Sequence, residues 1–462
     1  MHHNVPVTRV VIVGGGPGGY EAALVAAQLG ADVTLVSRDG LGGSTVLTDC
    51  VPSKTLVAAA EVVSTAGQTA RMGLGAAASP AVDLGQVNAR IKALAQAQSA
   101  DIARGLEAAG VAVVVGKAHL TSASELVVER AGESHTLSAD AVLIATGARP
   151  RISESAKPDG ERILTWEQVY DLPELPSRLI VVGSGVTGAE FAGAYRALGS
   201  EVVLVSSRDR VLPGEDADAA AVIEEVFERR GITVMPRSRA TSAERTADGV
   251  VVTLEDGRRV EGSHCLMAIG SVPNTDNLGL AAAGVKTTDA GFIDVDKVSR
   301  TSTSGVYAAG DCTGVLMLAS VAAMQGRIAM WHALGDSVHA LNLHTVSSTV
   351  FTDPEIATVG VTQHDVDAGA VDAVVIRLPL ATNARAKMQG IDDGFVKVFA
   401  RTGSHTVLGG VVVAPRASEL IFPLTLAVEN RLTVDQVAST FTIYPSLTGS
   451  IAEAARRLHT SS

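Results

Sequence analysis

Two stretches of the chain share one order of segments: an apolar run, a group of glycines, a helical pattern and a second apolar run. In the first stretch the apolar runs cover residues 8–13 and 32–36, and the helical pattern between them ends at Gln28. The second stretch, over residues 179–205, repeats this order. Short apolar runs bounded by turn residues predict buried strands. The order therefore predicts two parallel βαβ units, each typical of a dinucleotide-binding domain.

The remaining parts of the chain follow other patterns. A long helical pattern covers residues 84–109, and residues 150–160 have the proline and glycine content of a linker. From about Leu343 onward, strand-like segments such as 394–400 and 407–413 alternate with amphipathic helical patterns. We therefore expect an α/β protein with two Rossmann-like dinucleotide-binding domains and an α+β domain at its C-terminal end.

The composition agrees with this expectation and excludes several classes of function. A chain of 462 residues has room for roughly three domains. Its net charge of −12 argues against a surface that follows nucleic-acid phosphates, although backbone amides can still bind a nucleotide locally. No apolar run has the length of a membrane span, and the N-terminal residues lack the pattern of a signal peptide. We expect a cytoplasmic protein with no nucleic-acid partner.

The three cysteines, Cys50, Cys265 and Cys312, lie far apart in the sequence. Their spacing fits neither a disulfide framework nor a set of metal ligands, and the eleven histidines are dispersed. We expect no metal site.

Each glycine turn follows an apolar strand and precedes a helix, which is the context that gives a Gly-x-Gly-x-x-Gly motif its meaning. The first glycine allows a tight turn, the second lets the backbone approach a pyrophosphate, and the third lets the helix pack on the strand. The N-terminus of the helix then offers unpaired N–H groups to the phosphates. The glycines with these roles are Gly14, Gly16 and Gly19 in the first turn and Gly183, Gly185 and Gly188 in the second.

Residues 42–54 resemble the redox-active segment of the flavoprotein disulfide reductases, the family of dihydrolipoamide dehydrogenase and glutathione reductase. That segment contains two cysteines; here the second is Cys50, but Thr45 stands in place of the first. Because a threonine cannot close a disulfide, exchange between a dithiol and a disulfide is excluded at this position. Cys50 is then a small packing residue or, in the alternative, a thiolate.

The resemblance extends over essentially the whole chain and implies its domains. It implies an FAD-binding domain in two parts, residues 1–150 and 271–342, with an NAD(P)-binding domain over 151–270 between them. Residues 343–462 would form the interface domain of a homodimer, in which each active site is completed by the partner chain.

The resemblance also implies the FAD site. The first glycine turn would bind the pyrophosphate, Asp311 a ribityl hydroxyl, and the amide of Ala319 would face the flavin ring. Asp311 could instead be an ordinary helix cap or turn aspartate. Ser37 stands where the family usually has an acidic residue for the adenosine ribose, so we expect a modified contact there. The expected FAD-binding residues are Gly14, Gly16, Gly19, Ser37, Arg38, Gly43, Ser44, Lys54, Ala118, Thr146, Gly147, Asp311 and Ala319.

The second unit would bind the nicotinamide nucleotide. NAD-specific relatives carry a glutamate where Ser206 stands, and that glutamate repels a 2′-phosphate. With Arg208 and Arg210 nearby, we expect NADPH to be accepted together with NADH; the arginines could also be plain solvated turn residues. The expected residues are Gly183, Gly185, Val186, Thr187, Gly188, Ser206, Arg208 and Gly270.

The reaction centre implied by the resemblance is a lysine–glutamate pair beside the flavin, formed here by Lys54 and Glu190. A second difference from the family lies near the C-terminus, where Tyr444 replaces the catalytic histidine and Gly449 replaces its orienting glutamate. A phenol titrates near 10 and is a poor proton shuttle at neutral pH. The residues that we expect at the reaction centre are Lys54, Glu190, Thr45 and Tyr444.

Three parts of the dithiol mechanism are thus replaced together. We expect an FAD-dependent NAD(P)H:quinone oxidoreductase without lipoamide dehydrogenase activity, in which Thr45, Cys50 and the partner's Tyr444 form walls for a flat acceptor. Two alternatives remain open, a soluble pyridine nucleotide transhydrogenase and a flavin-bound redox sensor with negligible turnover.

Overall fold

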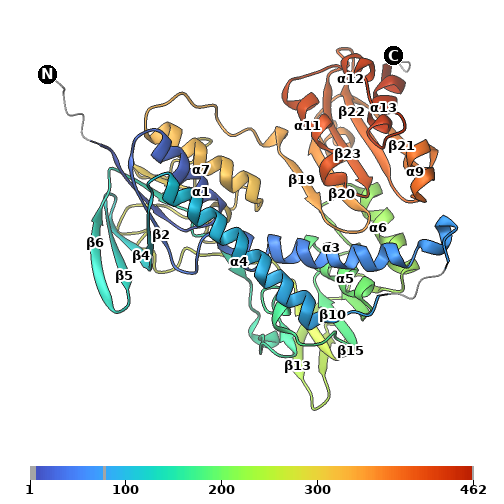
Figure 1. The fold of residues 1–462 in the computed structure, drawn as a ribbon, viewed down its shortest axis with the longest axis horizontal. Coiled ribbons are helices and arrows are strands. Elements are labelled where there is room, and N and C mark those ends of the chain that lie inside the picture. Colours follow the sequence, from blue (N-terminus) through green and yellow to red (C-terminus); the bar gives the residue numbers. More distant parts are fainter. Residues whose placement is uncertain (1–6, 76–79, 460–462) are drawn as a thin grey trace. The chain divides into compact units, whose positions relative to one another are not determined.

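The computed structural model describes residues 7–75 and 80–459 (Figure 1). These residues form two compact units. The first unit comprises the described residues within 1–53, 88–151 and 270–342. The second unit comprises those within 54–87, 152–269 and 343–462.

The first unit is built on a five-stranded parallel sheet with the order β18-β7-β1-β2-β3. Its central strands are buried on both faces, as parallel strands covered by helices and loops are, whereas the edge strand β3 is largely exposed. Helices α1 (Pro17–Gln28) and α7 (Ala319–Ala333) lie side by side on it (Figure 1). The strands are β1 (Arg9–Val13), β2 (Asp32–Ser37), β3 (Ala112–Val115), β7 (Ala141–Ile144) and β18 (Val306–Ala308).

Smaller elements complete this unit. An antiparallel sheet contains β4 (Lys117–Ser122), β5 (Glu125–Arg130) and β6 (Glu133–Ser138), and β8 (Ala148–Pro150) pairs with β17 (Ser271–Pro273). Helix α2 covers Gly43–Leu47. The boundary between the two units falls within α3 (Cys50–Ala66) and α4 (Leu84–Ala108).

The second unit contains another five-stranded parallel sheet, with the order β12-β11-β10-β16-β9. Its βαβ unit consists of β10 (Arg178–Val182), α5 (Val186–Leu198) and β11 (Glu201–Val205), and α6 (Ala217–Arg229) follows. The other strands of the parallel sheet are β9 (Ile163–Leu164), β12 (Thr233–Met235) and β16 (His264–Met267). Strands β13 (Ala240–Arg245), β14 (Val250–Leu254) and β15 (Arg259–Gly262) form a separate antiparallel sheet.

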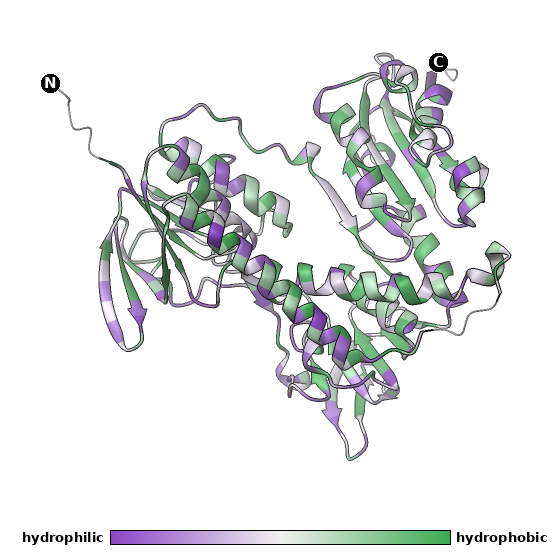
Figure 2. Cartoon of the chain, viewed as in Figure 1, coloured by the Kyte–Doolittle hydropathy of each residue, from purple (hydrophilic) through white to green (hydrophobic). Residues whose placement is uncertain are grey.

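The C-terminal part of the second unit is an antiparallel sheet with the order β19-β20-β23-β22-β21 and helices packed against it. Figure 2 shows that its central strands are largely hydrophobic. The strands are β19 (Ser347–Val350), β20 (Glu355–Gly360), β21 (Ala373–Pro379), β22 (Phe395–Arg401) and β23 (Val407–Ala414). The helices are α8 (Gln363–Asp367), α9 (Ala384–Gln389), α10 (Ala417–Leu420), α11 (Phe422–Glu429), α12 (Val434–Ser439) and α13 (Gly449–His459).

The apolar patterns located the main elements well. The strands expected over 8–13 and 32–36 are β1 and β2, the helix expected over 84–109 is α4, and the strand expected over 407–413 is β23. The division into four domain segments stays a prediction, since the contacts define two units and place residues 54–87 in the second. Within the described residues, no helix has the length and apolar character needed to cross a membrane.

Candidate active site

The first glycine turn has the shape of a pyrophosphate cradle. A Cβ on Gly19 would overlap the carbonyl oxygen of Gly14, whereas one on Gly16 would meet only the Cα of Gly43, 4.0 Å away. The turn is therefore closed on the side of the strand and open on the side where a ligand would lie. Helix α1 begins at Pro17, which has no N–H, and it has no side-chain cap. The N–H groups of Gly19 and Tyr20 donate to the carbonyl of Gly16, so that of Gly18 is the amide of the first turn that can face a phosphate oxygen.

Asp311 follows β18 and begins a short 3-10 turn. Burial raises the pKa of its carboxyl group, and no group in the described part of the chain donates a hydrogen bond to it. Its side chain caps no helix among the described residues, whereas its place at the start of a turn keeps the alternative of a turn aspartate open. Nearby, α7 begins at Ala319 without a side-chain cap. A half-buried acceptor and open amides both fit a polar ligand such as FAD.

The carboxyl end of β2 borders a pocket of about 600 Å³. Arg38 and Lys117 lie in its wall, together with residues 129–134 of the β5–β6 hairpin. The hydroxyl of Ser37 is buried and donates to the carbonyl of Gly40 at 2.6 Å, so it holds this turn together. The ribose contact expected of Ser37 stays a prediction.

The other residues expected to bind FAD in this unit have positions that the sequence could not give. Thr146 donates its hydroxyl hydrogen to the carbonyl of Asn274 at 2.8 Å, and Gly147 follows with a φ of +69°. Ala118 is buried within β4. Gly43 and Ser44 form the first residues of α2.

The second glycine turn repeats the geometry of the first. A Cβ on Gly188 would overlap the carbonyl oxygen of Gly183, and one on Gly185 would meet no atom within 4 Å. Helix α5 begins at Val186, again without a side-chain cap, and Thr187 follows in its first turn. At the far end of β16, Gly270 has a φ of +89° and open space around it.

At the end of β11, beside this turn, a serine stands at position 206 and Arg208, Asp209 and Arg210 follow. The hydroxyl of Ser206 is fully buried and shares a 2.6 Å hydrogen bond with that of Ser184, so it supports the turn. Arg208 is exposed, and its carbonyl accepts a 2.7 Å bond from the N–H of Arg237, which is also exposed. Neither guanidinium forms an ion pair within the described residues. The sequence reasoning missed Arg237, which lies 29 residues after Arg208.

Lys54 and Glu190, 136 residues apart in the chain, meet in the second unit. The Nζ of Lys54 lies 2.6 Å from Oε2 of Glu190, whose side chain is 4% exposed against 31% for the lysine. The N–H of Phe351 donates to the other carboxylate oxygen at 2.8 Å, and its ring centroid lies 4.8 Å from Nζ. The predicted ion pair is therefore formed, with Phe351 as an additional partner that no sequence signal indicated.

The cysteines offer no dithiol. None of the three, all of which lie within the described residues, forms a disulfide. Burial raises the pKa of Cys265 to about 12 and that of Cys312 to about 11, so neither supplies a thiolate at neutral pH. Thr45 and Cys50 are half-buried on α2 and at the start of α3.

Tyr444 lies in an exposed loop before α13. Its exposed fraction is 86%, and Phe441 and Ile443 in the same loop are exposed by 102% and 80%. Three large apolar side chains in one exposed loop are typical of a surface that another chain covers. This agrees with the expectation that the loop reaches a partner.

Two glycine cradles, each followed by an uncapped helix, together with a half-buried lysine paired to a buried glutamate are typical of a flavin- and nucleotide-dependent oxidoreductase. The chain belongs to the pyridine nucleotide-disulphide oxidoreductase family: residues 8–326 match this family and residues 346–455 match its dimerisation domain. This confirms the resemblance and the fold class, and with them FAD and NAD(P)H as cofactors and a homodimer.

The chain is similar to two kinds of curated protein. An NAD(P)H dehydrogenase (quinone) of Mycobacterium tuberculosis (strain ATCC 25618 / H37Rv) is 55% identical over 463 residues, covering 98% of this chain and 94% of that protein. Dihydrolipoyl dehydrogenase 2 of Haloarcula marismortui is 36% identical, covering 97% of this chain and 96% of that protein.

Two solved structures have the same fold as this chain. The crystal structure of LpdA from Mycobacterium tuberculosis matches with a TM-score of 0.94 and 55% identity, covering 98% of this chain and 100% of that one. The flavoprotein disulfide reductase RclA from Escherichia coli matches with a TM-score of 0.86 over 97% of this chain and 99% of that one. Its 23% identity shows a shared fold alone.

Proposed function

We propose that this protein is an FAD-dependent NAD(P)H:quinone oxidoreductase that reduces its acceptor directly from the flavin. The observation that carries the proposal is the combination of an intact Lys54–Glu190 pair with a threonine at position 45. The lysine–glutamate pair is kept, whereas the disulfide that would pass electrons to a thiol substrate cannot form. The 55% identical relative named NAD(P)H dehydrogenase (quinone) supports the same reaction.

The reaction is NAD(P)H + H⁺ + quinone → NAD(P)⁺ + hydroquinone. FAD, when bound, would supply the two-electron redox chemistry that links the nucleotide to the quinone. The chain binds the two pyrophosphates through the turns at Gly16 and Gly185. Lys54 supplies a fixed positive charge where negative charge accumulates, and Glu190 offsets the cost of burying that charge.

The acceptor site would use the residues that replace the dithiol machinery. Thr45 and Cys50 offer a small hydroxyl and a small apolar thiol in place of the disulfide. The exposed loop around Tyr444 supports a role in the homodimer, in which the partner's Tyr444 would form the opposite wall and stack on the quinone or donate a hydrogen bond to its carbonyl.

NADPH would bind through a 2′-phosphate site at the end of β11. Arg208 and Arg237 are exposed, have no acidic partner within the described residues, and are held together through a backbone hydrogen bond. A guanidinium binds a phosphate in a bidentate manner. Ser206 brings no carboxylate to the position where an NAD-specific relative carries its glutamate, so a 2′-phosphate is not repelled there, and NADH remains acceptable. A cytoplasmic location stays a prediction.

The test is steady-state oxidation of NADPH and NADH by the purified holoenzyme with menadione, lipoamide or a nicotinamide analogue as acceptor. Rapid turnover with menadione and none with lipoamide is expected. Brisk lipoamide turnover would refute the proposal. Hydride transfer to the nicotinamide analogue that exceeds menadione reduction would identify a transhydrogenase, and bound FAD without turnover would indicate a redox sensor.

A further inference from the structure

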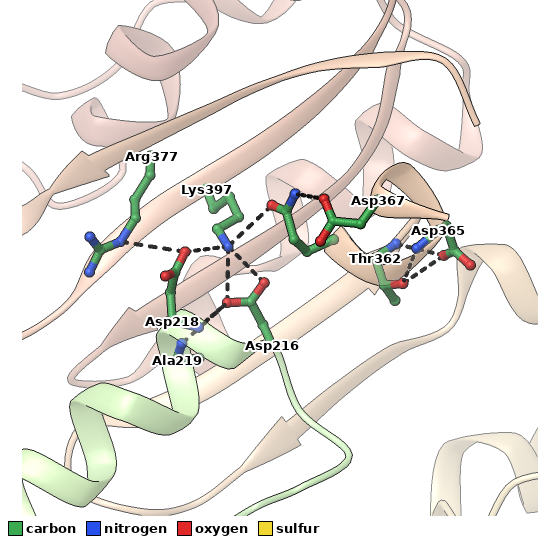
Figure 3. A network of polar contacts seen from close by, with 9 residues as sticks. Asp216, Asp218, Ala219, Thr362, Asp365, Asp367, Arg377 and Lys397 are labelled. Atoms are coloured by element: carbon green, nitrogen blue, oxygen red, sulfur yellow. Dashed lines mark hydrogen bonds and ion pairs between the residues drawn. The ribbon is translucent and has the colours of Figure 1, made fainter. Parts of the chain in front are cut away.

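A lysine lies buried in the sheet of the C-terminal domain, within the otherwise apolar strand β22. The side chain of Lys397 is 3% exposed, and its Nζ lies 2.8 Å from Asp216 and 2.6 Å from Asp218 (Figure 3). Both aspartates belong to the nucleotide-binding part, at the start of α6. The charged cluster thus joins two domains of one unit.

Both carboxylate oxygens of Asp216 have polar partners. One of its oxygens accepts hydrogen bonds from the N–H groups of Asp218 and Ala219 and thereby caps α6, and both oxygens contact Lys397. Its side chain is 5% exposed. The hydrogen bond to Lys397 lowers the pKa of Asp218, so this carboxylate stays charged at neutral pH.

A buried cluster of this kind is a weak device for stability, because removing charges from water costs about as much as their attraction returns. Apolar side chains of similar volume would fill the same space. The cluster instead fixes a position, because an ammonium group between two carboxylates permits only one placement of the start of α6 relative to the sheet.

The start of α6 is continuous with the loop that carries Arg208 of the proposed 2′-phosphate site. In this loop, the N–H of Leu212 donates to the carbonyl of Ser184 in the second glycine turn at 2.8 Å. The N–H of Val211 donates to Glu224 of α6 at 2.7 Å. A shift of α6 would therefore move the loop and the glycine turn together.

The opposite end of α6 is also attached to the C-terminal domain. Arg229 pairs with Asp393, and Arg230 pairs with Asp353 at 2.6 Å. Asp353 lies two residues after Phe351, whose N–H binds Glu190. The helix is thus fixed at one end beside the lysine–glutamate pair and at the other end beside the nucleotide loop.

We propose that Lys397 is a positioning residue for nucleotide binding: between Asp216 and Asp218 it fixes the start of α6, and hence the loop 206–216, in the position that receives NAD(P)H. Lys397 touches neither nucleotide nor flavin in this proposal. The inference rests on the proposed function, because it assumes that the loop binds the nucleotide.

The test is the double variant Asp216→Asn/Lys397→Met in the FAD-loaded dimer. Asparagine keeps the helix cap, and replacing both charges together leaves no buried charge without a partner. The KM for NADPH should rise roughly tenfold, while kcat, the KM for menadione and the FAD content stay within about twofold. Lys397→Arg, which keeps the charge, should restore most of the affinity.

The matched control is Arg377→Gln. Arg377 lies 3.9 Å from Asp218, is 46% exposed and has no part in the proposal, so its loss should leave the KM for NADPH unchanged. An unchanged KM in the folded double variant would overturn the inference, since a merely structural cluster alters the melting temperature and leaves the KM alone.

If the double variant does not fold, the variant Asp218→Asn tests the inference in its place. Its carboxylate is 47% exposed, so its removal is tolerated, and a roughly threefold rise in the KM for NADPH is expected. No rise would overturn the inference. A wild-type enzyme that oxidises neither NADPH nor NADH would instead refute the proposed function, and the two failures are thereby distinguished.

Discussion

Replacing Lys54 with methionine separates the electrostatic role of the lysine from its structural role. The substitution keeps the apolar stem but removes the charge that lies 2.6 Å from Glu190. Glu190 is 4% exposed and retains the Phe351 N–H as a hydrogen-bond donor. Removing one partner of a buried ion pair costs about 3–5 kcal/mol. Because the lysine is 31% exposed, we expect the lower end, about 3 kcal/mol.

The same substitution should slow hydride transfer to the flavin by about 10²- to 10³-fold, which is the usual effect of removing one fixed group that stabilises developing charge. The second variant, Lys54→Met/Glu190→Gln, separates the two effects. Glutamine still accepts the N–H of Phe351 and leaves no buried charge, so stability should return to within about 1 kcal/mol of wild type. The rate should remain low.

The assays are urea unfolding followed by flavin fluorescence and stopped-flow reduction by NADPH followed by flavin absorbance. FAD content serves as the control for both variants. A double variant that regains both stability and rate would refute the reasoning, because Lys54 would then have only a structural role. A single variant that retains the wild-type rate would refute it equally.

The remaining predictions concern the second glycine turn, Arg208, Tyr444 and the loss of stability at acid pH. Gly188→Ala should give no folded protein because the added Cβ overlaps a backbone carbonyl, whereas Gly185→Ala should fold and raise the KM for NAD(P)H. Circular dichroism and steady-state kinetics check both variants. Wild-type kinetics of the folded Gly185→Ala protein would contradict the account. Arg208→Gln should raise the KM for NADPH roughly tenfold and leave that for NADH unchanged, and an equal rise for both nucleotides would argue against a 2′-phosphate contact. Tyr444→Ala should raise the KM for menadione while the rate of flavin reduction by NADPH stays constant; a slower reduction step would place the tyrosine elsewhere. Hydrogen bonds to Arg456 and Arg457 lower the pKa of Glu453 to about 2. The ionised carboxylate therefore contributes its full stabilisation above the usual pKa of 4.5, and this contribution is lost as the pH falls towards 2. The unfolding midpoint of Glu453→Gln should not show this loss of stability.

The sequence predicted the parts of the fold that follow local patterns. The apolar strands around both glycine turns are where periodicity placed them, because the turn chemistry and the burial of parallel strands are encoded locally. The pairing of Lys54 with Glu190 was also predicted, although the two lie 136 residues apart, since each occurs in a motif of the family.

Other features could not be read from the sequence because they depend on contacts between distant segments. Phe351 reaches Glu190 across 161 residues, and Lys397 stands in a strand whose pattern looks like any other buried strand. Ser206 stands at the end of the strand where a ribose contact was expected, but its hydroxyl shares a hydrogen bond with the hydroxyl of Ser184 instead. Only the folded chain shows which partner a polar side chain takes.

The central claim is that no sulfur stands between the flavin and its oxidant. Anaerobic titration of the purified holoenzyme with dithionite tests this directly, because it counts the electrons that the protein accepts. Complete bleaching of the flavin by a single two-electron equivalent per FAD is the predicted result. A requirement for a second equivalent, taken up before the flavin bleaches, would reveal a redox-active disulfide and contradict the account.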